Sequence, residues 1–358
     1  MAFAISPDAL DSHAAKLTEL SDAIAGADAY ATEHLTIGLV DTSFVFAGVI
    51  GDCDRVLASI TTLQKDLTDV LVLSSAELAG TAQRSRDLDD ALEGELDSAY
   101  PGEIDPLAAR SIPTAQAAYV VPFAPGAVLT TPVDEGEVDL VGEILGADWF
   151  SPSFWLMQVM DLVLDWNPVD VVAKNFSGNW NALYTFESAA YNLGRFHVAQ
   201  ADNIGYAMSV TANTWKGEAA DAANIYFTKM ASVTRTTGND LMRIAPEFSI
   251  VARSMETTGD NVGGLLNSAI DAMIVAAVIY AAGAATSATG VGAIVGALGG
   301  SAALVTAVVW LDQAWNAISG VMAIVEALSM TIEFFSTYDS TQSGYVKPIA
   351  YDNPTVDL

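Results

Sequence analysis

The side chains that most often carry out chemistry in proteins are few in this chain and far apart. The sequence has one cysteine, Cys53, and three histidines, His13, His34 and His197. A single cysteine excludes an internal disulfide and a cysteine-based metal site, and the wide spacing of the histidines argues against an all-histidine site. We expect Cys53 to be an inert core residue and His197, on an apolar helical stripe, to be a buried imidazole.

Catalytic motifs are also missing from the sequence. The carboxylate pairs Asp89–Asp90 and Asp161–Asp165 have no histidine, lysine or nucleophile near them, so no general acid or base is assigned. The chain has no P-loop, no G-x-S-x-G and no Rossmann fingerprint. We predict a protein that is not an enzyme and has no cofactor or metal. An enzyme with its residues scattered in the region 99–150 is the remaining alternative.

The composition excludes one large class of partner. The chain has 358 residues with 44 acidic and 14 basic side chains, which gives a net charge of −30. Nucleic acid is excluded as a partner because no basic surface is available to neutralise phosphates, and charge alone does not favour anionic lipid. Hydrophobic residues make up 52% of the chain, enough for sizeable cores. The first residues show no basic and apolar regions of a Sec signal peptide.

Residues 1–98 predict a helical domain. Ser6-Pro7-Asp8 has the residue types of a helix start. We expect a polar, glycine-containing break from Gly26 to His34 and then one long amphipathic helix, whose acidic run from Asp87 to Asp97 marks a solvated end. The apolar residues of that helix recur at three- and four-residue spacing: Leu57, Ile60, Leu63, Leu67, Val70, Leu71 and Leu78.

Residues 99–150 contain six of the twelve prolines, which excludes long helices. We predict a Pro-rich linker there, with extended chain at 119–121. Helical patterns resume in the region 151–262.

The clearest pattern is a pair of apolar helical runs between residues 176 and 257, on either side of Trp215-Lys216-Gly217. Gly217 permits a reversal of the chain, and Trp215 is suited to plugging the end of a helical hairpin. We predict an antiparallel hairpin with arms of about 37 residues, or ~55 Å. Its apolar stripe should pack against the stripe of residues 1–98, or against a partner.

Residues 263–335 predict an apolar, Ala/Gly-rich hairpin followed by a last helix at 312–335, with a polar tail at 336–358. No charged residue occurs from 272 to 311. The predicted turn is 286–290. Three glycines at four-residue spacing should allow close helix packing: Gly292, Gly296 and Gly300.

Two environments are open for this apolar hairpin. The arm 291–311 is long enough to cross a bilayer core of ~30 Å, whereas the arm 272–285 is short and has Asp271 at its base. Either other parts of the protein bury the hairpin or it inserts into a membrane. We expect it to fold against the rest of the chain in water. The fold class that these patterns predict is all-α, an elongated helical bundle of long antiparallel hairpins.

The Trp215-Lys216-Gly217 hairpin resembles the Trp-x-Gly turn of the WXG family of type VII (ESX) secretion substrates. Residues 1–98 resemble EspC-type secretion-associated proteins through Phe3, Ile5, Pro7, Leu10, His13-Ala14 and Leu17. Further segments are similar to the shared N-terminal region of large actinobacterial type VII effectors: 151–155, 167–168, 178–180 and 282–293.

The resemblance implies a secreted or cell-envelope protein, exported without a signal peptide, that acts through helix–helix interaction or self-assembly. Its implied partners are the type VII machinery and a small WXG protein or a separate toxin. The family's export motif Tyr-x-x-x-Asp/Glu does not occur in this sequence, which leaves that motif to a co-secreted partner. The alternative function is a membrane-active protein that inserts the hairpin 272–311 to form a pore or a toxin conduit. A homo-oligomer and membrane contact both remain open.

Overall fold

The computed structural model describes residues 4–38, 43–99, 124–133, 136, 138–145, 168–285 and 291–341. The predicted all-α class is confirmed in these residues. The elements in chain order are α1 (Pro7–His34), α2 (Phe44–Ala99), the 3-10 helix η1 (Pro125–Val128), α3 (Leu140–Leu145), α5 (Pro168–Phe176), α6 (Ala182–Thr211), α7 (Glu218–Ala285) and α8 (Val291–Thr341). The extended chain predicted at 119–121 lies outside the described residues, as do residues 151–167 and 342–358.

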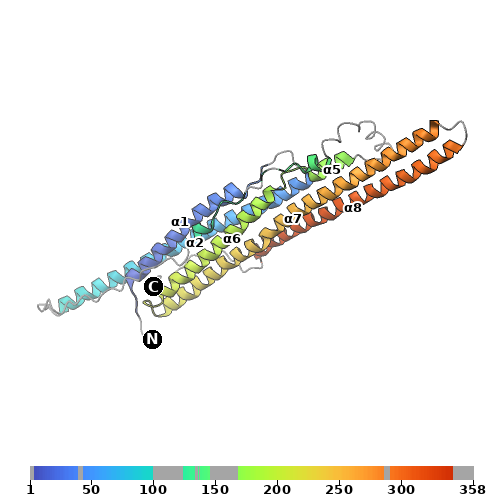
Figure 1. Cartoon of the computed structure of the whole chain (residues 1–358). Coiled ribbons are helices and arrows are strands. Elements are labelled where there is room, and N and C mark those ends of the chain that lie inside the picture. The colour runs from blue at the N-terminus through green and yellow to red at the C-terminus, as the bar shows by residue number, and fades with distance from the viewer. Residues whose placement is uncertain are drawn as a thin grey trace.

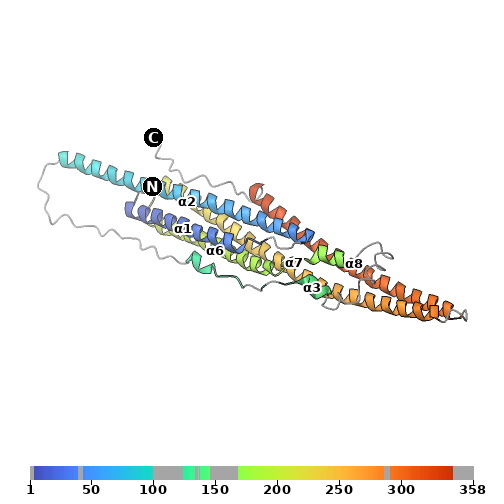
Figure 2. The ribbon, with the colours of Figure 1, turned by 90° about the horizontal axis from the view of Figure 1, so that it is seen from above.

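The helices run roughly along one long axis and form an elongated bundle (Figure 1). At one end of the bundle α7 and α8 continue together beyond the other helices. At the opposite end the last turns of α2 extend alone, as both views show (Figures 1 and 2). The acidic side chains of that α2 extension whose burial is described are exposed, as predicted for a solvated end: Asp87, Asp89, Asp90, Glu93 and Glu95.

The core lies where the apolar stripes of α1 and α2 meet those of α6 and α7. Buried side chains from all four helices belong to one contiguous cluster, including Leu17, Leu71, Phe196 and Phe227. The prediction that the stripes of 1–98 and 176–257 pack on each other within one chain is therefore confirmed. The C-terminal half of α8 joins this bundle, where the Ser329 hydroxyl donates a hydrogen bond to the buried carboxylate of Asp52 on α2.

Polar side chains fix α1 antiparallel to α6. The Gln200 amide donates to the Leu20 carbonyl at 2.8 Å, and both residues are buried. Nearer the other end of α1, the Tyr30 hydroxyl donates to the Thr130 carbonyl at 2.8 Å, and the Asn192 amide donates to the Tyr30 hydroxyl at 3.1 Å. These bonds fasten the chain around Thr130 to the bundle. The described part of the predicted linker therefore packs on helices.

Three predicted element boundaries differ from the structure. The break expected from Gly26 to His34 is wrong, because α1 is helical throughout this range and the chain leaves the helix only at Leu35. Likewise, α8 is one helix from Val291 to Thr341, so no separate helix begins at residue 312. The boundary expected at residue 262 falls inside α7, which continues without interruption for 68 residues.

The α6–α7 hairpin is closest at two glycines. A Cβ atom added at Gly238 would lie 2.5 Å from the carbonyl oxygen of Gly194 and 2.9 Å from Cγ2 of Val198. A Cβ added at Gly194 would lie 2.6 Å from the carbonyl oxygen of Gly238. The two backbones therefore touch without intervening side chains, and glycine is required at both positions.

Gly238→Ala is expected to lower the free energy of unfolding by about 1–3 kcal/mol, because the new methyl group forces α6 and α7 apart. The matched control is Gly264→Ala in the same helix, where an added Cβ meets no atom within 4 Å. The control should gain up to about 1 kcal/mol from the helix propensity of alanine. Urea unfolding followed by circular dichroism measures both. Equal stability of the two variants would contradict the close contact.

Candidate functional site

Trp215 and Gly217 lie in the short connection between α6 and α7. The Trp215 side chain is 2% exposed and belongs to the core cluster. Gly217 has φ 120°, a backbone conformation that side chains with a Cβ rarely adopt. The chain reverses here because Gly217 permits the turn while the indole closes the end of the bundle. Since the ring is covered, it is not available to a partner of the folded chain.

The N-terminal segment covers this turn. The amide of Lys216 donates to the carbonyl of Ala4 at 2.7 Å, and the amide of Ala4 donates back to Lys216 at 3.4 Å. These bonds form an isolated antiparallel bridge between two residues that are far apart in the sequence. The turn and the start of the chain therefore form one packed end of the bundle.

A second turn packs in a similar way between α5 and α6. Gly178 has φ 134°, and a Cβ there would lie 2.4 Å from Cδ1 of Phe46. The buried ring of Trp180 meets Phe46 edge to face, with centroids 4.7 Å apart, and its Nε1 donates to the Phe176 carbonyl at 2.8 Å. The segment Gly178-Asn179-Trp180 thus holds the start of α6 against α2.

The buried histidines and the cysteine form no catalytic arrangement. Nδ1 of His13 lies 3.0 Å from the Thr211 hydroxyl, and burial lowers the pKa of His13 to about 3. Burial lowers the pKa of His197, which packs edge to face on Phe196, to about 4. Burial and the neighbouring Asp52 and Asp54 raise the pKa of the Cys53 thiol, which keeps it protonated. His197 and Cys53 are core residues, as predicted.

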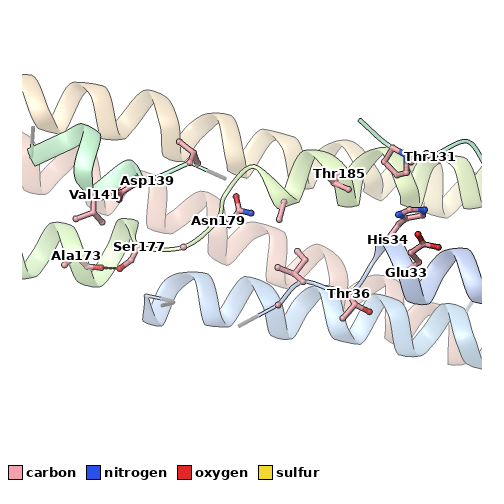
Figure 3. A pocket seen from close by; sticks show the side chains of 16 residues that line it. Glu33, His34, Thr36, Thr131, Asp139, Val141, Ala173, Ser177, Asn179 and Thr185 are labelled. Atoms are coloured by element: carbon pink, nitrogen blue, oxygen red, sulfur yellow. Dashed lines mark hydrogen bonds between the residues drawn. The ribbon is translucent and has the colours of Figure 1, made fainter. Parts of the chain in front are cut away.

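A pocket of about 840 Å³ lies where the end of α1 meets α5, the start of α6 and the chain around residues 131–141. Figure 3 shows Glu33 and His34 together at one end of the pocket and Asp139 at the other, so Asp139 is separated from the imidazole. Several of its polar groups hold local structure. Asp139 accepts a hydrogen bond from the Gly142 amide at 2.9 Å, and the Thr185 hydroxyl donates to the Val133 carbonyl at 3.2 Å.

Metal chemistry has no support in the part of the chain that the structure describes. Among those residues, no three histidine, cysteine, aspartate or glutamate side chains come together in a way that could hold a metal ion. The pocket is lined by the imidazole of His34 and the carboxylates of Glu33 and Asp139, and no described hydrogen bond joins these groups to one another. We assign no reaction to it.

The apolar tip, which we define as residues 272–285 of α7 and 291–311 of α8, has apolar side chains both between its arms and on its outside. The described buried residues are Met273, Ala276, Ala307 and Leu311. Other large aliphatic side chains face outward. Those exposed are Ile274, Val275 and Val278 on α7 and Val305, Val308 and Val309 on α8.

In the part of the chain that the structure describes, no helix from the rest of the bundle covers the apolar tip, whereas we expected the hairpin to fold against the rest of the chain. Both α3 and α5 lie beside α7 at the base of the tip, where the Ile144 carbonyl oxygen of α3 is 3.0 Å from a Cβ added at Gly263. Beyond that level α7 and α8 pack only on each other among the described helices (Figures 1 and 2). One described stretch, Ala302–Glu333, is long and apolar enough to cross a membrane, and 28% of its most apolar window is buried. Only its first part, residues 302–311, belongs to the apolar tip.

The glycines expected to allow close packing lie in α8: Gly292, Gly296 and Gly300. Their surroundings fall outside the part that the structure describes. The close contacts that it does describe occur at other glycines, namely the pair Gly194 and Gly238 and the pair Gly259 and Gly263, against which Ile144 of α3 packs. Sequence reasoning missed the pair Gly194 and Gly238. The pair could have been found, because the two residues are nearly equidistant from the turn at 212–217, and such residues face each other in an antiparallel hairpin.

The fold and these features define an all-α, elongated helical bundle with a tryptophan-closed turn near one end and a protruding apolar hairpin at the other. No known protein family, curated protein or solved structure matches the chain.

Proposed function

We propose that this chain is a non-enzymatic membrane-docking protein that inserts its apolar tip into the hydrocarbon region of a lipid bilayer. The observation that carries the proposal is the outward position of six large aliphatic side chains on a hairpin that no other described helix covers. In water such a surface is unfavourable, whereas lipid chains solvate it. Small residues between the arms are typical of helices that associate inside membranes.

Lipid suits the apolar tip better than one partner helix does. A partner helix would cover a single stripe, but the tip presents aliphatic side chains from both arms and no charged residue from 272 to 311. Each half-exposed valine or isoleucine contributes on the order of 1 kcal/mol when it leaves water, so the six exposed side chains contribute about 6 kcal/mol before the entropic cost of docking. That is enough for reversible membrane binding.

The charge of the protein selects the kind of lipid. Asp271 and Asp312 flank the tip, both are exposed, and the whole chain carries a net charge of −30. A surface rich in anionic headgroups repels these carboxylates within a Debye length. We therefore expect binding to zwitterionic phosphatidylcholine vesicles and weaker binding when anionic lipid is added.

The test is co-flotation of the purified chain with phosphatidylcholine vesicles. The double variant Val278→Asp and Val305→Asp places charges on side chains that are 62% and 64% exposed on the tip. The aspartate at position 278, which lies deeper in the hydrocarbon region, alone costs about 2.5–3.5 kcal/mol, so the double variant should bind about a hundredfold more weakly. The folded bundle should not change, because both positions already face solvent.

The matched control is Ile225→Asp, which is 70% exposed on α7 near the turn at the other end of the bundle. This variant should float with vesicles like the native chain. Equal binding of all three proteins, or no binding by the native chain, would reject the proposal. If the native chain does not bind lipid but forms an oligomer that the double variant cannot form, the tip serves self-assembly instead.

We also propose export through a type VII secretion system as the route to that membrane. The supporting observation is the Trp215-Lys216-Gly217 turn between two long antiparallel helices, α6 and α7. In an actinobacterial host the chain should reach the culture medium only when the secretion ATPase and a partner that carries the export motif are present. Export that persists after deletion of the ATPase would reject this route.

A further inference from the structure

We infer that Asp271 sets the depth of insertion, so that the apolar tip enters the bilayer from one side and ends inside it without reaching the far interface. This inference rests on the proposed membrane docking. In this arrangement the tip is a re-entrant hairpin. It enters the hydrocarbon core through one leaflet and turns back within the core. A pore-forming or spanning hairpin is the alternative that this inference excludes.

The lengths of the two arms carry the argument. The uncharged part of α7 runs from Ala272 to Ala285 and spans ~21 Å, whereas the uncharged part of α8 runs from Val291 to Leu311 and spans ~31 Å. A bilayer core is ~30 Å thick. Because the arms are antiparallel, the shorter one determines how far both can enter. The exposed Asp271 reaches the headgroups when the end of the hairpin is past the midplane but still short of the opposite surface.

The aromatic residues of α8 agree with this depth. Positions equidistant from the connection between the end of α7 at Ala285 and the start of α8 at Val291 face each other across the hairpin, which puts Val305 level with Asp271. Trp310 lies five residues above Val305, or ~7.5 Å. A headgroup layer is ~5–7 Å thick on each side, and tryptophan is enriched there. At the depth that Asp271 permits, the partly buried Trp310 is at the headgroup level.

Removing the charge of Asp271 should allow the apolar tip to insert more deeply into the bilayer. Without Asp271 the uncharged part of α7 would run from residue 261 to 285, because the next charged residue towards the N-terminus is Asp260. That stretch spans ~37 Å, which exceeds the ~30 Å core. Both arms of the Asp271→Asn variant are then long enough to cross. The matched control is Asp312→Asn, which leaves the shorter arm unchanged.

The experiment locates the tip with a single thiol. Cys53→Ala removes the native cysteine, and Val291→Cys places a thiol at the start of α8. The variant is bound to phosphatidylcholine vesicles. A membrane-impermeant thiol reagent is placed either in the outer solution or, in a separate sample, in the lumen of the vesicles. We expect little labelling from either side in this background and in Asp312→Asn. Asp271→Asn should increase labelling from the lumen by about tenfold, given the cost of a carboxylate in the core.

Three results would overturn the inference: labelling from the lumen with Asp271 present, labelling from outside, or no effect of Asp271→Asn. Flotation of the same samples distinguishes a failure of the depth limit from a failure of the proposed membrane docking. If the protein floats with vesicles but the thiol reaches the lumen, docking stands and the depth limit fails. If the protein does not float, docking itself fails.

Discussion

Trp215→Ala is expected to lower the free energy of unfolding by about 3–5 kcal/mol, the usual range for removing a fully buried tryptophan. The indole is 2% exposed and belongs to the cluster in which α1, α2, α6 and α7 meet. The N-terminal bridge between Ala4 and Lys216 holds the chain over this end of the bundle. These contacts keep the cavity left by the ring from collapsing, so the cost should be near the upper end of the range.

The matched control is Trp315→Ala in α8, where the side chain is 50% exposed. This variant should lose about 1 kcal/mol or less, because water already reaches the ring. Chemical denaturation followed by circular dichroism compares the two. If both variants lose the same stability, the turn does not depend on the buried indole. If Trp215→Ala keeps native stability but is no longer exported, the residue acts in docking and not in packing.

Apolar periodicity predicted the helices and their mutual packing, but charged and glycine residues misled the boundaries. Gly26 lies within α1 because the stripe continues on both sides of it, with Ile24 and Tyr30 buried, and one glycine costs a helix only about 1 kcal/mol. Asp312 does not end α8, because its side chain is exposed and a helix tolerates a charge on its solvent face. Tertiary packing determines whether α1 continues through Gly26 and whether α8 continues through Asp312. A short segment of the sequence does not reveal that packing.

The sequence also predicted only part of the candidate sites, because the rest depends on tertiary packing. The Trp215 turn was predictable because a tryptophan and a glycine separate two long apolar runs. The apolar tip was visible as a stretch without charge, but which side chains face outward was not, since a segment that is apolar all round has no periodicity to define a face. Whether other helices cover the tip depends on where α3 and α5 end, and that is a property of the whole fold.

Acid is expected to destabilise the folded chain through its buried histidines. Burial holds the pKa of His13 at about 3 and that of His197 at about 4, whereas an unfolded histidine titrates near 6.5. Below pH 6.5 the unfolded state therefore binds protons that the folded state does not. The free energy of unfolding falls by up to about 1.4 kcal/mol per pH unit for each histidine, or about 3 kcal/mol each by pH 4.

Carboxylates titrate in the same range, so the histidine contribution has to be separated by substitution. His197→Leu removes an imidazole whose two nitrogens have no hydrogen-bond partner in the described part of the chain. The native chain and this variant share the same carboxylates. The difference between their unfolding free energies should therefore shift by about 3 kcal/mol in favour of the variant between pH 7 and pH 4.

Gln64→Leu is the matched control, because Gln64 is a buried side chain on α2 whose amide atoms also lack partners among the described residues but carry no titrating proton. Removing that amide should change stability by the same amount at both pH values. If His197→Leu behaves like Gln64→Leu, the imidazole is not held neutral by the bundle. If only His197→Leu removes part of the acid sensitivity, the α1–α2 and α6–α7 pairs are held together by a core that excludes charge, and acid loosens the bundle at this histidine.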